Sequence, residues 1–142
     1  MREDSPMSDS TPRARLGWVI VYVPDVAAAI DFHERAFGLS RRFVADDQSY
    51  GELDTGSTTL AFASEALGDS HHDGGFRRAS NGEQPGNVEI CLVFDDVPAA
   101  FEHALSAGAT DLAAPAAKPW GQTVAYVRDP FGTLIELASP LG

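Results

Sequence analysis

The chain of 142 residues lacks several features that define common classes of protein. It has one cysteine, Cys91, so it cannot form an internal disulfide framework, and a reducing compartment is expected. No apolar run approaches the roughly 18 residues that span a membrane, and no signal-peptide pattern opens the chain. We therefore expect a cytoplasmic protein that makes no membrane contact.

Basic residues are also scarce. The chain has 10 Lys and Arg against 21 Asp and Glu, which gives a formal net charge of −11. A nucleic-acid-binding protein needs a basic face, so a nucleic acid partner is not expected. The acidity can serve solubility, or it can draw a cationic small molecule towards a cleft. The length and a 44% hydrophobic content suit one domain with a sizeable core.

The chain contains an internal repeat: the same pattern of elements occurs in each half. In each half a β-rich run ends at an Asp that can cap a helix, first Asp25 and later Asp96. Each helix is rich in small residues and is closed by a glycine, Gly38 in the first half and Gly108 in the second. The apolar run at residues 59–64 is matched in the same way by residues 134–139.

Each copy is predicted to form a strand, a helix and three further strands. The expected strands are residues 16–23, 41–45, 49–54 and 58–63, then 88–94, 110–113, 123–128 and 134–138. Asp129-Pro130-Phe131-Gly132 is predicted to be a tight turn between the last two strands. The predicted fold class is α+β, with two βαβββ modules at residues 16–64 and 88–139.

The segments outside the modules are polar. Residues 1–15 are predicted to be a flexible tail, and residues 16–142 a single domain. Residues 65–87 are rich in Gly, Ser, Asp and His and are predicted to be irregular. This stretch is either a linker between the modules or a flap over a cleft.

Alternation along the strands predicts which side chains face that cleft. Ile135 and Leu137 suit the face beneath the helices, so the side chain between them points the other way. The repeat transfers this assignment to the other strands. The predicted cleft-facing residues are Trp18, Tyr22, Ala61, Glu89, Cys91 and Glu136.

Several features of this sequence resemble the vicinal oxygen chelate superfamily. They are the doubled unit, its capping residues Asp25 and Asp96, and the segments Asp129-Pro130-Phe131-Gly132 and Leu134-Ile135-Glu136-Leu137. This superfamily includes glyoxalase I, extradiol dioxygenases, and fosfomycin- and bleomycin-resistance proteins. The likeness covers about residues 16–139. It implies the glyoxalase/bleomycin-resistance fold, a curved mixed sheet around a cleft, and a homodimer, since relatives build their clefts across a subunit contact. It does not specify an activity, because the group spans several chemistries and includes non-catalytic binders.

The resemblance also bears on metal binding. Relatives that use a metal take ligands from four inward strand positions, which here are Trp18, Ala61, Glu89 and Glu136. Two carboxylates without an imidazole suit zinc, nickel or iron(II) poorly, and they would hold magnesium only weakly. We expect neither a metal nor another cofactor. The four histidines do not change this expectation, since His33 and His103 fall on the helices and His71 and His72 on the linker.

Aromatic surface is predicted in place of the metal. Trp18 and Trp120 can form walls for a flat ligand, where stacking contributes roughly 0.5–1.5 kcal/mol per pair beyond burial. Alternatively, Trp18 packs in the core or in a dimer interface, and Trp120 covers the strand beside its turn. Tyr22 is less specific and can pack in the core. We expect Cys91 to be a buried, inert thiol.

Glu89 and Glu136 have several possible roles. They can share a metal, act as acid and base, bind a cationic ligand, or remain solvated or paired with arginine. If they lie close together in an apolar cleft, one of them keeps its proton near neutral pH. The leading hypothesis is a metal-independent small-molecule binder of bleomycin-resistance type, with an aromatic and possibly cationic ligand. The alternative is a glyoxalase-like lyase or isomerase that uses these two residues, with or without a divalent metal. A structural or regulatory partner subunit is a third possibility.

Overall fold

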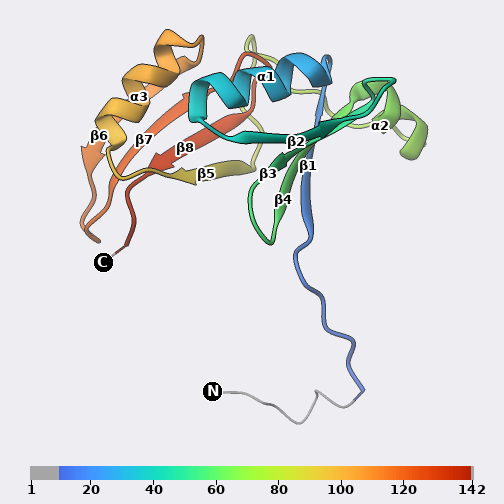
Figure 1. The fold of residues 1–142 in the computed structure, drawn as a ribbon, viewed down its shortest axis with the longest axis horizontal. Helices are drawn as coiled ribbons and strands as arrows, with labels where there is room; N and C mark the ends of the chain where they lie inside the picture. The colour runs from blue at the N-terminus through green and yellow to red at the C-terminus, as the bar shows by residue number, and fades with distance from the viewer. Residues whose placement is uncertain (1–9, 142) are drawn as a thin grey trace.

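The protein is described by a computed structural model that covers residues 10–141 (Figure 1). Residues 1–9 of the predicted tail lie outside this range, and residues 10–17 contain no helix or strand. The elements in chain order are β1 (Trp18–Val23), α1 (Val26–Phe37), β2 (Ser40–Val44), β3 (Tyr50–Asp54), β4 (Thr59–Ser64), α2 (Glu65–His71), β5 (Glu89–Val93), α3 (Val97–Ser106), β6 (Thr110–Ala117), β7 (Thr123–Arg128) and β8 (Leu134–Ala138).

Each module forms its own 4-stranded mixed sheet. The strand orders are β1-β4-β3-β2 and β5-β8-β7-β6, so the two sheets have the same topology. The first strand of each module pairs in parallel with the last, and the remaining pairs are antiparallel. The predicted α+β class and the two-module architecture are confirmed, with the mixed sheet divided between the modules.

Helices α1 and α3 begin at the predicted caps, and α1 ends at the predicted Gly38, whereas the C-cap of α3 is Ala107 and not the predicted Gly108. The Asp25 carboxylate accepts a hydrogen bond from the backbone N–H of Ala28, and the Asp96 carboxylate accepts one from Ala99, both at 3.0 Å. Gly38 follows α1 with φ 71°, a left-handed conformation that glycine adopts without steric cost. These caps specify the boundaries through residues that are near each other in the chain.

Both long helices lie side by side on the same side of the two sheets (Figure 1). Leu60 and Phe62 of β4 pack beneath α1, and Ile135 and Leu137 of β8 lie in the cluster packed around α3. Phe32 of α1 belongs to this second cluster, so one apolar core joins the modules. The opposite sheet faces are left to carry the predicted site.

Two predicted segments differ in the structure. The prediction that residues 65–71 are irregular is wrong, because they form α2. The Ser64 hydroxyl caps this helix by accepting a hydrogen bond from the backbone N–H of Leu67 at 3.1 Å. Strand β6 extends to Ala117, beyond the predicted end at residue 113. It tolerates Pro115 because it is the outermost strand of its sheet and its register with β7 shifts there.

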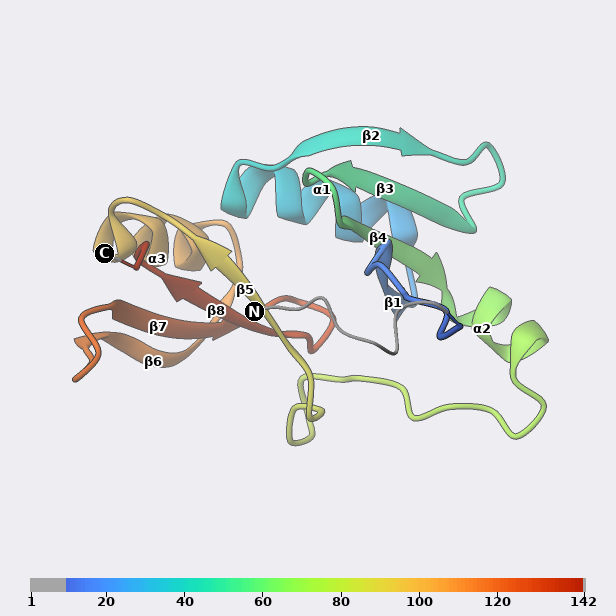
Figure 2. The same ribbon diagram turned by 90° about the horizontal axis from the view of Figure 1, so that it is seen from below.

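The rest of the predicted linker, residues 72–87, is called the strap. Figure 2 shows it running from α2 to the start of β5. The guanidinium of Arg128 donates hydrogen bonds to the carbonyl oxygens of Ser80 at 2.9 Å and Glu83 at 2.6 Å. The Asn81 amide donates to the carbonyl oxygens of Asp129 and Pro130 at 3.2 and 2.9 Å. The strap is therefore bound to the second module.

Within residues 10–141, no helix is long and apolar enough to cross a membrane.

Candidate functional site

Four polar side chains gather on the free face of the second sheet. Glu89 and Cys91 alternate with the half-buried Ile90 and Leu92 along β5, so both point away from the helices. The parallel register places Glu136 of β8 beside Cys91, and the antiparallel register places Tyr126 of β7 beside Glu136. The structure thus brings together three of the predicted residues, Glu89, Cys91 and Glu136, and adds Tyr126, which the sequence analysis missed.

Glu89, Cys91 and Tyr126 all have raised pKa values. The hydrogen bond to Glu136, together with burial, raises the pKa of Glu89 to about 7. Burial and the nearby Glu136 charge raise the pKa of Cys91 to about 11, and the same two causes raise the pKa of Tyr126. A pair of acidic groups that share a proton near neutral pH can exchange that proton with a substrate or release it to a cation.

The expected burial of Cys91 is wrong, because its side chain is exposed. The strand alternation that points Glu89 to the open face points Cys91 there as well. The expected inertness agrees with its raised pKa, since a thiol with a pKa of about 11 carries little thiolate at neutral pH.

A second cluster lies on the free face of the first sheet. The indole N–H of Trp18 donates to Oε2 of Glu52 at 2.9 Å, and the Tyr50 hydroxyl donates to the same oxygen at 2.6 Å. Arg42 donates to Oε1 at 3.2 Å. The Glu52 side chain lies beside Ala61, which is fully buried. Trp18 and Ala61 are therefore on the predicted face, but the Glu52 carboxylate from β3 covers this face.

This cluster has its own electrostatics. The Tyr50 hydrogen bond is the main cause that lowers the pKa of Glu52. Burial, followed by the Glu52 hydrogen bond, raises the pKa of Tyr50 to about 12. The lowered pKa favours the charged form of Glu52, whose two oxygens accept hydrogen bonds, whereas the raised pKa of Glu89 favours its protonated form. The two modules offer chemically different surfaces.

Tyr22 and Trp120 lie apart from both clusters. The Tyr22 hydroxyl is 3.0 Å from Nε2 of His72, and its ring is 4.7 Å from that of Phe76 in the strap. Trp120 is 61% exposed in the β6–β7 turn, where its indole donates to Gln122 at 2.7 Å. Within residues 10–141, no hydrogen bond or ring contact joins either tryptophan to Glu89 or Glu136.

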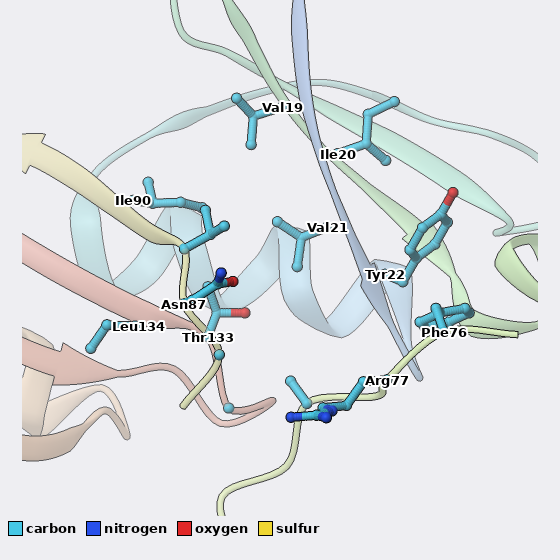
Figure 3. Close-up of a pocket in the computed structure, with 14 residues that line it drawn as sticks. Val19, Ile20, Val21, Tyr22, Phe76, Arg77, Asn87, Ile90, Thr133 and Leu134 are labelled. Carbon is cyan, nitrogen blue, oxygen red and sulfur yellow. The ribbon is translucent and has the colours of Figure 1, made fainter. Parts of the chain in front are cut away.

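Two cavities lie where the modules meet. One, of about 360 Å³, is bordered by Glu89 and Cys91 and by apolar side chains of both modules, including Leu60. The other, of about 280 Å³, lies beside Tyr22 and is shown in Figure 3, where β1 faces Ile90 and Leu134. Neither Trp18 nor Trp120 is among the described residues that line either cavity. The first cavity touches the predicted residues Glu89 and Cys91, and the second touches the predicted residue Tyr22.

Comparison with known proteins identifies the family. The family model described as the Glyoxalase/Bleomycin resistance protein/Dioxygenase superfamily matches residues 15–137. The chain belongs to this superfamily. The resemblance drawn from the sequence is thereby confirmed.

Solved structures share the fold of this chain. A glyoxalase-related enzyme from Fulvimarina pelagi is 22% identical with a TM-score of 0.74, over 89% of this chain and 88% of that chain. A glyoxalase/bleomycin resistance protein/dioxygenase from Nocardioides is 15% identical with a TM-score of 0.73, over 95% and 89%. TioX from Micromonospora sp. ML1 is 22% identical with a TM-score of 0.66, over 90% and 100%. No curated protein sequence matches the chain.

The residues at the four positions where metal-using relatives carry ligands do not fit a transition metal. The Trp18 indole donates its N–H to Glu52 and offers no lone pair, and Ala61 has no ligand atom. Glu89 and Glu136 alone give a hard, two-carboxylate donor set. Among residues 10–141, no group of three or more His, Cys, Asp or Glu side chains is arranged to hold a metal ion.

Proposed function

We propose that the protein is a metal-independent small-molecule-binding protein of the bleomycin-resistance type. It sequesters an organic cation with an apolar or aromatic body, and antibiotic resistance is one role that such sequestration serves. The observation that carries this proposal is the position of Glu89, which borders an apolar cavity of about 360 Å³ and whose pKa is raised to about 7 by the neighbouring Glu136 together with burial. A cation can take the place of the proton on Glu89, while the cavity covers its apolar body.

The lining of that cavity supports an organic ligand over an inorganic ion. Val19 and Leu60 come from the first module, and Val88, Ile90 and Leu92 from the second. Apolar walls with few polar groups are typical of sites for small organic molecules. Tyr126 stands beside Glu136 and supplies an aromatic face with which a cation interacts favourably.

The proposal includes a homodimer. In residues 10–141 β1 pairs only with β4, and β5 only with β8, so each sheet has one free edge at the module boundary. Large apolar side chains are exposed on these two strands, among them Trp18 at 57% and Val93 at 62%. A second chain that covers both strands would bury this surface and add walls to the cavity.

Equilibrium binding tests the proposal with a panel of aromatic cations, each matched with its neutral analogue. The expected result is a cation that binds at least about tenfold more tightly than its neutral analogue, and that loses at least about tenfold in affinity in Glu136→Gln. Glu102→Gln removes one exposed carboxylate from α3 and serves as the charge-matched control. Failure of every cation to bind, or equal affinity in Glu136→Gln, would refute the proposal.

Sedimentation velocity tests the dimer separately. Ile20 is exposed on β1, and Ile20→Asp places a charge on the proposed contact without altering the core. A dimer that this substitution dissociates supports the proposed contact. A wild-type protein that stays monomeric at high concentration contradicts it.

A second candidate function is a glyoxalase-like lyase or isomerase, which the Glu89 pKa of about 7 favours. A carboxyl group that titrates near neutral pH can take a proton from a carbon acid or return it to the product. Metal analysis of protein purified without chelator separates the candidates. A stoichiometric divalent metal that is lost in Glu136→Ala favours the enzyme, and its absence together with tight cation binding favours the binder.

A further inference from the structure

A buried titratable pair joins the two modules, outside the site described above. His33 of the first module lies in α1, and Asp129 of the second follows β7; both side chains are fully buried. Nε2 of His33 lies 3.8 Å from Oδ2 of Asp129. Within residues 10–141, these two atoms are the buried side-chain nitrogen and oxygen that have no hydrogen-bond partner.

The surrounding hydrogen bonds determine where protons can be. Nδ1 of His33 is 2.9 Å from the carbonyl oxygen of Ala29, which can only accept, so Nδ1 carries a hydrogen. In a neutral ring, Nε2 then carries a lone pair and no hydrogen, so it can only accept a hydrogen bond. Oδ1 of Asp129 accepts from the backbone N–H groups of Phe131 and Thr133, both at 2.9 Å, so Oδ2 is the free oxygen. Without a further proton, two buried acceptors face each other, which is unfavourable.

We propose that His33 and Asp129 share one buried proton that ties α1 to the Asp129–Gly132 turn, and that loss of this proton above neutral pH loosens the turn and the strap bound to it. The proton on Oδ2 is donated to Nε2, which closes the 3.8 Å separation to hydrogen-bond length. The protonated pair is neutral, as a fully buried site requires.

Neighbouring charges do not replace this proton. Around His33, the rings of Phe32, Phe37 and Phe62 are apolar contacts from α1 and β4. The charged groups on and around α1 are engaged elsewhere. Asp31 pairs with Arg35, Glu34 pairs with Arg41, and His103 of α3 contacts the Arg35 carbonyl.

The charge next to Asp129 is also engaged. The guanidinium of Arg128 is directed at the carbonyl oxygens of Gly132, Ser80 and Glu83. Burial lowers the pKa of His33 and raises the pKa of Asp129, so both directions favour the uncharged forms. This agrees with a proton that resides on the carboxyl group.

The strap would respond because it rests on the same turn. The Asn81 amide donates to the carbonyl oxygens of Asp129 and Pro130, and Arg128 holds Ser80. Gly132 approaches Ser80 so closely that an added Cβ would lie 2.8 Å from its backbone nitrogen. A shift of the turn is therefore passed directly to residues 80–83, and through them to the strap wall of the smaller cavity.

The sign of the pH dependence follows from counting protons. Between about pH 4 and 6.5 the unfolded chain binds one proton at these two residues, on the histidine, and the folded pair also binds one. Above pH 6.5 the unfolded chain loses its proton while the folded pair keeps its own. Stability then falls as pH rises, and the unfolding equilibrium constant grows by up to tenfold per pH unit until the folded pair titrates.

Denaturant unfolding from pH 5 to 9 tests this with Asp129→Asn. The amide keeps the acceptor for Phe131 and Thr133 and brings a permanent N–H donor for Nε2 of His33, so no proton is needed. We expect this variant to gain stability relative to the wild type as pH rises above 6.5. Asp96→Asn, the same change at the exposed cap of α3, should keep the wild-type profile in that range. Parallel profiles for the wild type and Asp129→Asn would overturn the proposal.

Two further measurements complete the test. Amide hydrogen exchange of residues 80–83, corrected for intrinsic pH effects, should lose protection above neutral pH in the wild type and not in Asp129→Asn. Unchanged protection in the wild type would overturn the coupling to the strap. If Asp129→Asn fails to fold, nitrogen NMR of the wild-type His33 ring decides. A hydrogen-bonded Nε2 at pH 6.5 supports the shared proton, and an Nε2 without a bond contradicts it.

Discussion

The Trp18 indole donates a 2.9 Å hydrogen bond to the Glu52 carboxylate across an intervening strand. Trp18 belongs to β1 and Glu52 to β3, and β4 lies between them in the sheet. The bond passes over a strand whose nearby side chain, Ala61, is small enough to leave room for it. This contact makes one of the two predicted ligand-binding tryptophans part of the first module's own structure.

Loss of this hydrogen bond should cost measurable stability. Trp18→Phe keeps an aromatic ring but removes the N–H, so we expect about 1 kcal/mol of destabilisation in urea unfolding. Trp120→Phe removes an indole N–H that donates to Gln122 in an exposed turn, and should cost less than about 0.5 kcal/mol. Equal effects of the two substitutions would contradict the structural role of Trp18.

Stability should depend on pH through Glu89. Its folded pKa of about 7 lies above the ordinary glutamate value of 4.5, so its proton stabilises the folded state fully below pH 4.5. This contribution is lost as pH rises towards 7. Glu89→Gln keeps a donor to Glu136 and has no proton to lose, so its stability should increase relative to the wild type over this range. Denaturant unfolding at pH 4.5 and 7.5 measures the change, and a constant difference would count against the shared proton.

The Cys91 thiol should react slowly although it is exposed. Its pKa of about 11 leaves little thiolate at pH 8, so a disulfide reagent should react roughly tenfold or more slowly than with an unhindered cysteine. Glu136→Gln removes one cause of the raised pKa and should accelerate the reaction. Glu102→Gln, on α3, should leave the rate unchanged. A fast wild-type reaction would show that the thiol is not held in its neutral form.

The strap contact should make Gly132 more sensitive to substitution than Gly38. Both have positive φ, 99° and 71°, so an alanine is strained at either position. An added Cβ meets nothing within 4 Å at Gly38 but lies 2.8 Å from the Ser80 backbone at Gly132. We expect Gly38→Ala to cost about 1 kcal/mol and Gly132→Ala at least about 1 kcal/mol more. Similar costs, measured by thermal or urea unfolding, would show that the strap yields freely.

The predicted orientation of the strands was derived from short-range patterns. Alternation assigned Glu136 to the open face between buried Ile135 and Leu137, and the structure places all three in that way. The repeat then resolved the first strand, where residues 19–23 are apolar throughout. The exposed Trp18 and the buried Val23 follow that assignment. Both inferences need only the period of two along a strand.

The unpredicted residues come from strand pairing. Glu52 and Tyr126 occupy matching places in β3 and β7, next to Ala61 and Glu136 respectively. Their positions depend on the register of β3 with β4 and of β7 with β8. A period-two pattern gives the face of a strand but not its partner, so neither residue was predicted.

The order of the elements in the two modules, the starts of α1 and α3 and the inner faces of the strands were determined by the sequence. Capping residues, alternation and the internal repeat specify these features through residues that are near each other in the chain. Tertiary packing alone decided that β3 brings a carboxylate to Trp18 and that the strap is bound to the second module. It also decided that His33 meets Asp129 in the core. These contacts join residues far apart in sequence, and their geometry depends on how whole elements pack together.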